Sequence, residues 1–320
     1  QKIGQRRLGE RMYATSEMSS IRYVLQHPVD LAVFDVDDTL IMCPDPYFDV
    51  HILPNTPLSQ KILAVNDTRR DLFFMGSLAT RSWAIIEPQA PELITEFQSN
   101  GTKVIALTAL WPAIDKSLNL HIPNWRIKHL KTFGYDFSKS FPISCIYGFC
   151  GSDSQNTIEP YFKKGVMFSG EVPKAKALLS FLRTISFKPQ SVLFVDDNVN
   201  NVRSVYRELS RVGIECHSIL YTRTQKFPPS SMFSQEEYHS CLKRQEESVK
   251  EFLRLEDIYM AQETEKINTT SDTINTSDKS LTWLAPNSAP SMPRSSSNIG
   301  QDSSLPQQRA ESKKRKNLGF

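Results

Sequence analysis

Two apolar segments far apart in the chain are each followed at once by clustered aspartates, and this repeated pattern constrains the fold most. Residues 31–34 precede Asp35, and residues 191–195 precede Asp196. Short apolar runs of this kind are typical of buried strands in a parallel sheet. The carboxyl ends of such strands lie at one edge of the sheet, where α/β proteins place their chemistry. The sequence therefore predicts that both acidic elements line one site.

Strand-like and helix-like patterns alternate along residues 16–221. Apolar runs predict strands at 31–34, 103–108, 143–147, 166–168, 191–195 and 214–221. Helical spacing and helix start and stop signals predict helices at 16–25, 91–100, 110–120, 173–182 and 199–212. This alternation predicts an α/β fold with a doubly wound parallel sheet.

A long insert separates the first acidic strand from the next predicted helix. Residues 41–87 form a connection far longer than a parallel crossover requires. Within it, helical spacing occurs at 58–65 and 71–86. We expect a small, mainly helical cap over the carboxyl edge of the sheet, with an ordinary long crossover as the alternative.

The ends of the chain differ in composition from its centre. Residues 1–15 are polar and basic without a period, which predicts a flexible N-terminus before a core at 16–226. A capping box at Ser234 and Glu237 begins a predicted helical extension, 227–263. Residues 264–320 are rich in Ser, Thr, Asn and Pro, which predicts a disordered polar tail.

Composition excludes several classes of protein. The net charge of +3 is too small to indicate a nucleic-acid partner. No apolar run approaches the roughly 18 residues that span a bilayer, so we expect no membrane span and a soluble protein. The five cysteines have no CxxC spacing, which argues against a zinc site and a disulfide framework. We expect a monomer or weak oligomer. Because the first residue is Gln, the compartment stays open: cytoplasmic, or exported after signal cleavage or as a secreted effector.

The residue types of the acidic elements suit phosphoryl transfer, although a lone DxDxT also suits a helix cap or a solvated turn. Asp35 can attack phosphorus, and Asp37 can protonate the leaving oxygen and then deprotonate water. The carboxylates of Asp35 and either Asp196 or Asp197 can hold Mg²⁺ together with a main-chain oxygen and waters. Thr108, at the end of the predicted strand 103–108, would bind the remaining phosphate oxygens together with a lysine.

Two lysines, Lys174 and Lys176, compete for that role. Both lie in the first turn of the predicted helix 173–182, where a cation opposes the helix dipole unless an anion is nearby. A phosphate or an aspartate would resolve the conflict. The residue pattern alone does not choose between them.

The four elements together resemble the haloacid dehalogenase (HAD) superfamily, whose members are mostly Mg²⁺-dependent phosphatases with a Rossmann-like core. DVDDT at 35–39 is similar to the first motif, and VIALT ending at Thr108 is similar to the second. The resemblance implies that Asp35 is the nucleophile and that Asp37 is the acid/base, with its main-chain oxygen on the metal. KAKALLSFL resembles the third motif and selects Lys174 over Lys176.

The resemblance covers about residues 20–225 and includes a fourth motif, with two departures from the pattern of the superfamily. FVDDN is similar to the fourth motif and implies Asp196 as the main metal ligand, with Asp197 beside it. The strings FDVDDTL and FVDDNVNNVRSV look closest to a poorly characterised HAD-like group found in intracellular bacteria. Ala175 stands where relatives have glycine, and Ala109-Leu110-Trp111 stands where many have a small residue and an arginine.

These features lead to an expected function. We expect a Mg²⁺-dependent phosphatase that hydrolyses a small-molecule or protein phosphomonoester through an aspartyl-phosphate on Asp35. The alternative is a catalytically weak binding or effector protein that acts through its cap and C-terminal tail. Dehalogenation is disfavoured because dehalogenases lack the second aspartate, and phosphotransfer would differ only in the acceptor.

Overall fold

The computed structural model describes residues 5–7, 10–25, 27–44, 83–112, 114–115, 120–151 and 159–224, with a few positions between 234 and 247. A central sheet is built from β1 (Gln5–Arg7), β2 (Met12–Thr15), β3 (Leu31–Phe34), β6 (Lys103–Thr108), β9 (Cys145–Tyr147), β10 (Tyr161–Lys163), β11 (Val166–Phe168), β12 (Ser191–Asp196) and β13 (Glu215–Tyr221). These nine strands lie in the order β1-β2-β13-β12-β3-β6-β11-β10-β9.

The middle of this sheet is parallel. The neighbours from β2 through β13, β12, β3 and β6 to β11 all pair in parallel. Antiparallel pairing is confined to the two edges, where β1 joins β2 and the strands β10 and β9 follow β11. The predicted α/β fold with a mostly parallel sheet is confirmed.

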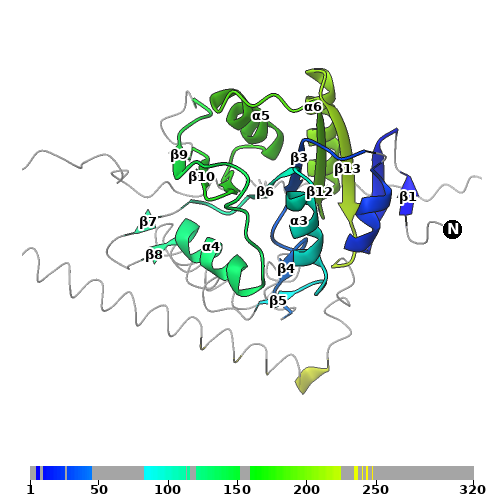
Figure 1. Ribbon diagram of the computed structural model, residues 1–320. Helices are drawn as coiled ribbons and strands as arrows, with labels where there is room; N and C mark the ends of the chain where they lie inside the picture. Colours follow the sequence, from blue (N-terminus) through cyan, green and yellow to red (C-terminus); the bar gives the residue numbers. More distant parts are fainter. Residues whose placement is uncertain are drawn as a thin grey trace, which may run out of the picture.

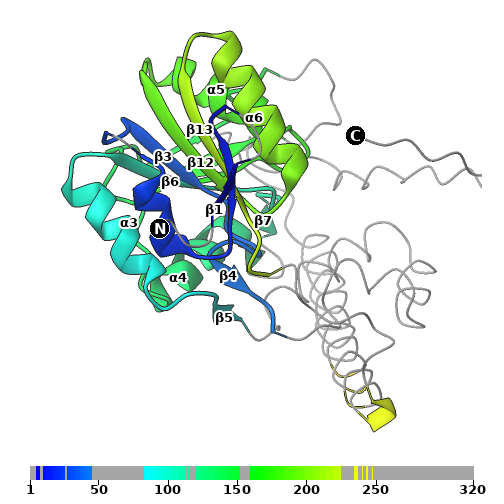
Figure 2. The same cartoon turned by 90° about the vertical axis from the view of Figure 1, so that its right-hand side faces the viewer.

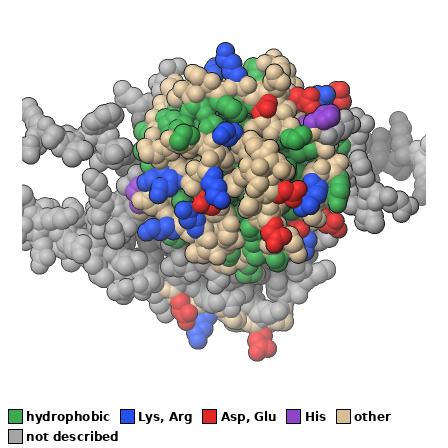
Figure 3. Space-filling model, in the orientation of Figure 1, with side chains coloured by type: hydrophobic (Ala, Val, Ile, Leu, Met, Phe, Trp, Pro, Cys, Tyr) green, Lys and Arg blue, Asp and Glu red, His purple; other side chains and the backbone are tan. Residues whose placement is uncertain are grey.

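Helices cover both faces of the sheet (Figure 1). They are the 3-10 helix η1 (Met18–Tyr23) and the α-helices α3 (Ala90–Ser99), α4 (Ile122–Thr132), α5 (Lys174–Thr184) and α6 (Val199–Arg211). Seen after a quarter turn, α5 and α6 lie on one side of the sheet and α3 and α4 on the other (Figure 2). Acidic and basic side chains both occur on the face drawn in Figure 3, as the small net charge leads one to expect.

The burial of strand β3 on both faces explains why residues 31–34 are all apolar. Successive side chains of a strand point to opposite faces, and here both faces are covered. Ala32 and Phe34 lie in the core beneath η1, α3 and α4. Leu31 and Val33 lie in the other core, beneath α5 and α6. All four side chains are fully buried, so this strand is fixed at the centre of the molecule.

The chain changes direction across the sheet between β3 and β12. From β3 it proceeds to β6 and β11 on one side, and after α5 it returns to β12 and β13 on the other. Ligands of open α/β sheets bind outside the carboxyl ends of strands at such a switch point. Asp35 and Asp196 lie at the carboxyl ends of these two neighbouring strands.

The expected flexibility of residues 1–15 is wrong for part of that segment. Met12–Thr15 forms β2, which pairs in parallel with β13 and extends the sheet. The amide of Thr222 also donates to the carbonyl of Thr15, at 2.9 Å. Three of the four side chains of β2 are only partly buried, so no apolar pattern marks this strand in the sequence.

The predicted helix at 110–120 is also wrong. Ile114–Asp115 forms β7 and Leu120–His121 forms β8, and these short strands pair antiparallel. The helix begins later, at Ile122, because Pro123 suits a first helical turn and the His121 ring accepts from the Asn124 amide at 3.1 Å. The other predicted strands and α-helices of the core are confirmed within one to three residues at their ends, and the predicted helix at 16–25 is a shorter 3-10 helix.

The insert is described only at its ends. Ile41–Met42 forms β4 and Ala84–Ile85 forms β5, and the two strands pair antiparallel, so Ala84 and Ile85 are not helical as predicted. The predicted helix at 58–65 and most of that at 71–86 lie outside the described residues, as does the cap. The same holds for the tail at 264–320. Within the predicted extension, the few described residues after Ser234 are helical.

Candidate active site

Asp35 lies at the carboxyl end of β3 with both carboxylate oxygens engaged. Its main-chain N–H donates to the carbonyl of Val195 at 2.8 Å, which ties it to β12. The amine of Lys174 donates to Oδ1, and the hydroxyl of Thr39 donates to Oδ2 at 3.1 Å. All of these groups are buried, so the carboxylate has a single defined orientation.

Asp196, at the end of β12, is held just as firmly. Lys174 Nζ donates to its Oδ2 at 2.7 Å, and the Asn198 amide donates to its Oδ1 at 2.8 Å. The side-chain amide of Asn201, in α6, reaches both oxygens at 3.1 and 3.2 Å. Lys174 therefore bridges Asp35 and Asp196, whereas Lys176 is exposed.

Three carboxylates converge at this point. Asp35, Asp196 and Asp197 each place an oxygen within 4.8 Å of the others. Burial raises the pKa of Asp35 well above its usual range, with Asp196 and Asp197 adding to the rise and Lys174 opposing it. Burial and the charge of Asp196 raise the pKa of Asp197 to about 6. The single ammonium of Lys174 leaves an excess of negative charge, so these oxygens could hold a metal ion.

The charge state of Lys174 follows from the same geometry. Burial lowers the pKa of an ammonium group, but the carboxylates of Asp35 and Asp196 outweigh burial and raise the pKa of Lys174 above its ordinary value. Lys174 is therefore a fixed positive charge at the first turn of α5. The unfavourable position relative to the helix dipole is resolved by two aspartates.

Asp37 faces a different set of partners. Thr108 Oγ1, at the end of the neighbouring strand β6, donates to Asp37 Oδ2 at 3.1 Å. Arg126 Nη2 donates to Asp37 Oδ1 at 2.8 Å. The Asp37 side chain is 36% exposed, so it lies at the open side of the cluster. Thr108 thus lies beside the DVDDT segment, because β6 is the neighbour of β3.

The neighbouring residue Asp38 shapes the loop. Its φ of +61° lies in the left-handed region, which Asp tolerates better than most residues. Its N–H donates to the carbonyl of Ile41 at 2.8 Å, and its carbonyl accepts from the Thr224 hydroxyl at 2.7 Å. Asp38 therefore turns the chain from the site into β4.

Arg126, like Asn201, is a site residue that sequence reasoning missed. Its side chain is fully buried, and its guanidinium carbon lies over two indole rings, 4.6 Å from the Trp83 centroid and 4.7 Å from the Trp125 centroid. The ring of His129 stacks on Trp125, with Nδ1 3.4 Å from Arg126 Nη1. The incorrect helix boundary at 110–120 hid this residue, because α4 was not expected.

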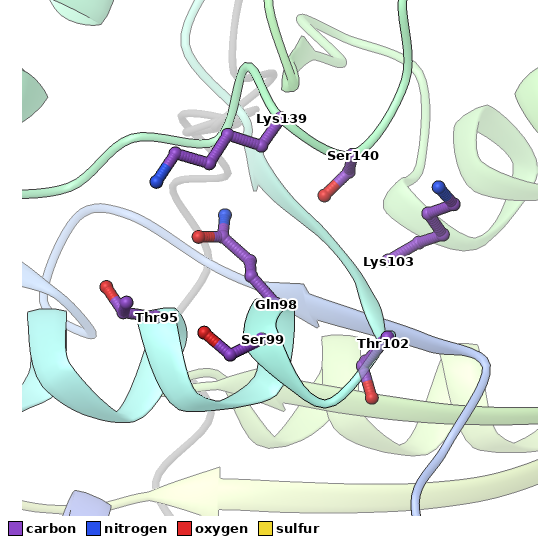
Figure 4. Close-up of a pocket in the computed structure, with 8 residues that line it drawn as sticks. Thr95, Gln98, Ser99, Thr102, Lys103, Lys139 and Ser140 are labelled. Carbon is purple, nitrogen blue, oxygen red and sulfur yellow. The ribbon is translucent and has the colours of Figure 1, made fainter.

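A pocket of about 200 Å³ lies away from this cluster (Figure 4). Lys103, the first residue of β6, lines it, so it is at the opposite edge of the sheet from Asp35. Its polar groups are largely engaged, since Gln98 donates to the Asp136 carbonyl and Ser140 bonds the main chain of Val104. It has no part in the acidic site.

Comparison with known proteins identifies the family. The model of a family described as "Protein of unknown function (DUF2608)" matches residues 14–265, which is most of the chain. The chain belongs to the DUF2608 family. The match includes the whole acidic cluster and the insert.

Relatives of this DUF2608 chain occur in Rickettsia. It is 27% identical over 149 residues to an uncharacterised protein of Rickettsia felis, covering 45% of this chain and 49% of the relative. It is 30% identical over 128 residues to the uncharacterised protein RP295 of Rickettsia prowazekii, covering 39% and 42%. The DUF2608 chain thus matches about half the length of these relatives.

A search of solved structures found the HAD domain of the effector protein Lem4 from Legionella pneumophila, an inactive mutant. The similarity to the DUF2608 chain covers 71% of this chain and 100% of that domain, with 18% identity and a TM-score of 0.34. At this TM-score it does not establish a shared fold, so the fold assignment rests on the strand order. Among the described helices of the DUF2608 chain, none has the length and apolar character of a membrane span.

Proposed function

We propose that this chain is a Mg²⁺-dependent phosphomonoesterase of the HAD type. One observation carries the proposal: Lys174 bridges Asp35 and Asp196 at the switch point of the sheet, with Asp197 within reach of both. Packing alone does not require three carboxylates and an ammonium in a buried cluster, because burying charge is costly. Perturbed and converging groups of this kind are typical of catalytic sites.

Each residue has a task in this reaction. A carboxylate oxygen of Asp35 attacks phosphorus, the bond to the leaving oxygen breaks, and Asp37 gives that oxygen a proton. An aspartyl-phosphate results. Asp37 then removes a proton from water, which attacks phosphorus, and Asp35 and inorganic phosphate are released. Thr108 and Lys174 would bind phosphate oxygens during both steps.

A divalent cation suits the donor set. The carboxylates of Asp35, Asp196 and Asp197 are hard oxygen donors with excess negative charge, and Mg²⁺ prefers such ligands. The main-chain oxygen of Asp37 would complete the protein ligands. When bound, Mg²⁺ would neutralise charge that develops on the transferred phosphoryl group. Asn201 and Asn198 keep Asp196 oriented for this purpose.

The test is hydrolysis of a panel of phosphomonoesters, including 4-nitrophenyl phosphate, with Mg²⁺. We expect activity in the unaltered chain and a loss of at least about 10³-fold in Asp35→Asn, which removes the nucleophile. Asp38→Asn is the matched control, because it is exposed, lies in the same loop and keeps a residue that tolerates positive φ. It should retain activity.

Acid quenching of the active chain should trap a phosphoryl group on Asp35, detectable by mass spectrometry. Full activity in Asp35→Asn would overturn the proposal. If the unaltered chain hydrolyses no phosphomonoester, the binding or effector role that acts through the insert and C-terminal segment takes its place.

A further inference from the structure

Arg126 is the charged side chain of this site that the proposed reaction does not use. It comes from α4, which lies outside the four motif segments. Its guanidinium is fully buried, yet it donates to a carboxylate that is 36% exposed. A buried arginine is costly unless its position matters, because its desolvation must be offset by good contacts.

The surroundings of Arg126 fix its orientation. The rings of Trp83 and Trp125 lie at 4.6 and 4.7 Å from the guanidinium carbon, which is a stacking arrangement that lysine cannot reproduce. Its Nε is buried and has no hydrogen-bond partner among the described residues. Among the described contacts, the hydrogen bond from Nη2 to Asp37 and the two indole rings fix how the guanidinium is oriented.

Asp37 is consequently held from two sides. Arg126 donates to Oδ1 and Thr108 donates to Oδ2, so the carboxylate cannot rotate freely in its half-open position. Each carboxylate oxygen has two acceptor positions, which leaves one on each oxygen for a leaving group or a water. An acid/base must be oriented before it can act, and a misplacement of about 1 Å can cost about 10²-fold in rate.

We propose that Arg126 is the positioning residue for Asp37, and that Trp83 at the exit of the insert holds Arg126 in place. This inference rests on the proposed function, since it assigns a role toward that acid/base. Trp83 directly precedes β5, the strand by which the insert rejoins the core. The orientation of Asp37 thereby depends on Trp83, at the point where the insert rejoins the core.

The experiment compares steady-state kinetics of the full chain and its variants with Mg²⁺ and 4-nitrophenyl phosphate, or the ester of the panel with the highest turnover. Arg126→Ala should lower kcat by about 10²-fold and leave KM unchanged, because Arg126 orients Asp37 and does not contact the substrate. Arg126→Lys keeps the charge but loses the planar guanidinium, so its kcat should lie between that of the unaltered chain and that of Arg126→Ala.

Added guanidinium ion provides a readout that a purely structural role would not move. It should restore part of the kcat lost in Arg126→Ala by occupying the space that the Arg126 guanidinium leaves beside the two indoles. Lys128→Ala, an exposed cation on the same helix, is the control and should neither lose kcat nor respond to guanidinium. Trp83→Ala should also lower kcat, because it removes an indole that holds Arg126.

The outcomes separate the two proposals. If the unaltered chain is inactive on the whole panel, the proposed function fails and this inference fails with it. If the unaltered chain is active, unchanged kcat in Arg126→Lys and Arg126→Ala, or a loss without guanidinium rescue, overturns the inference alone. Should Arg126→Ala not fold, Arg126→Lys decides, and a rise in KM with unchanged kcat in that variant contradicts a positioning role.

Discussion

At the scale of single residues, Lys174 determines the charge balance of the acidic cluster. Its ammonium forms ion pairs with both Asp35 and Asp196. All three side chains are nearly or fully buried. Removing one partner of a buried ion pair costs more than the pair contributes, because the remaining charge stays buried without compensation. The stability of the metal-free protein should therefore depend on Lys174 and not on Lys176.

The variant Lys174→Ala should lower the free energy of unfolding by about 3 kcal/mol in the presence of a chelator. Lys176→Ala, on the same helix but exposed, should change it by no more than about 0.5 kcal/mol. Urea unfolding followed by fluorescence measures both. Added Mg²⁺ should recover part of the loss in Lys174→Ala, and equal effects of the two substitutions would contradict the assignment of Lys174.

We expect His129 to make the stability of the folded protein depend on pH. Burial, with a smaller contribution from Arg126, lowers its pKa from 6.5 to about 4. The folded protein thus binds fewer protons at this group than the unfolded chain, so the stability it contributes is present above pH 6.5 and is lost as the pH falls from 6.5 to 4. Asp37 opposes the shift, and Trp83, Trp125 and Phe133 surround the ring.

His129→Phe should keep the aromatic contacts and remove this titration. Between pH 7 and pH 4.5 the unaltered protein should lose more unfolding free energy than the variant, as measured by urea unfolding at both pH values. His27→Phe, at an exposed histidine, should lose as much as the unaltered protein. A parallel decline in all three proteins would contradict the role of His129.

The sequence predicted that residues directly after two separate strands would lie at one site, and the structure brings these residues together. Asp35, Thr108 and Asp196 end three neighbouring strands, so strand order alone brings them together. Arg126 and Asn201 lie on helices, and a helix face gives no sign of which polar residue points into a site. Their contacts depend on crossing positions of helices that local patterns do not encode.

At the scale of elements, the turn between β10 and β11 contains Gly165, which has less room for a side chain than the other glycines compared. Gly165 has a φ of +81°, and a Cβ there would overlap the Phe137 carbonyl and lie 2.7 Å from the Phe137 Cβ. Gly213, which ends α6, has a similar φ of +80° but no atom within 4 Å. The two glycines share the backbone conformation and differ in the space around them.

Gly165→Ala should therefore be far more destabilising than Gly213→Ala. The second substitution incurs only the backbone cost of a left-handed alanine, about 1 kcal/mol. The first adds a clash with a neighbouring main chain and should cost more than about 3 kcal/mol or prevent folding. Thermal unfolding of both variants measures the difference, and similar melting temperatures would show that the Phe137 segment can move aside.

Elements were predictable where burial imposed a continuous apolar run or a helical period. β3, β6 and β12 are buried on both faces, and α5 packs one apolar face on the sheet, so their patterns are unambiguous. β2 is held by main-chain pairing at the side of the sheet, and β7 and β8 are two residues each. The conformation of such short strands is determined by the strands they pair with, and their sequences are too short to show a pattern.

At the scale of the whole molecule, the insert joins the core through the narrow β4–β5 ladder. Ile41 pairs with Ile85 and Met42 with Ala84, so the insert leaves and returns at one place. A two-residue turn such as Asn-Gly can close antiparallel strands of this kind. We therefore expect that residues 44–82 can be replaced by such a turn while Cys43 and Trp83 keep their places.

A chain in which Asn-Gly replaces residues 44–82 should fold with a melting temperature close to that of the unaltered protein, because a shorter loop costs less closure entropy. If the proposed function holds, it should still hydrolyse 4-nitrophenyl phosphate while discriminating less among esters. Circular dichroism and the ester panel measure both properties. Failure to fold would show that the insert contributes to the core.

The β4–β5 ladder also has an evolutionary consequence. Because both ends of the insert are fixed side by side, a lineage can lengthen, shorten or exchange the intervening residues without altering the register of the sheet. The sequence between these ends can thus diverge among descendants while the acidic cluster stays in place. Trp83 is the exception, since its indole stacks on Arg126, and any exchange that removes it also changes the support of Asp37.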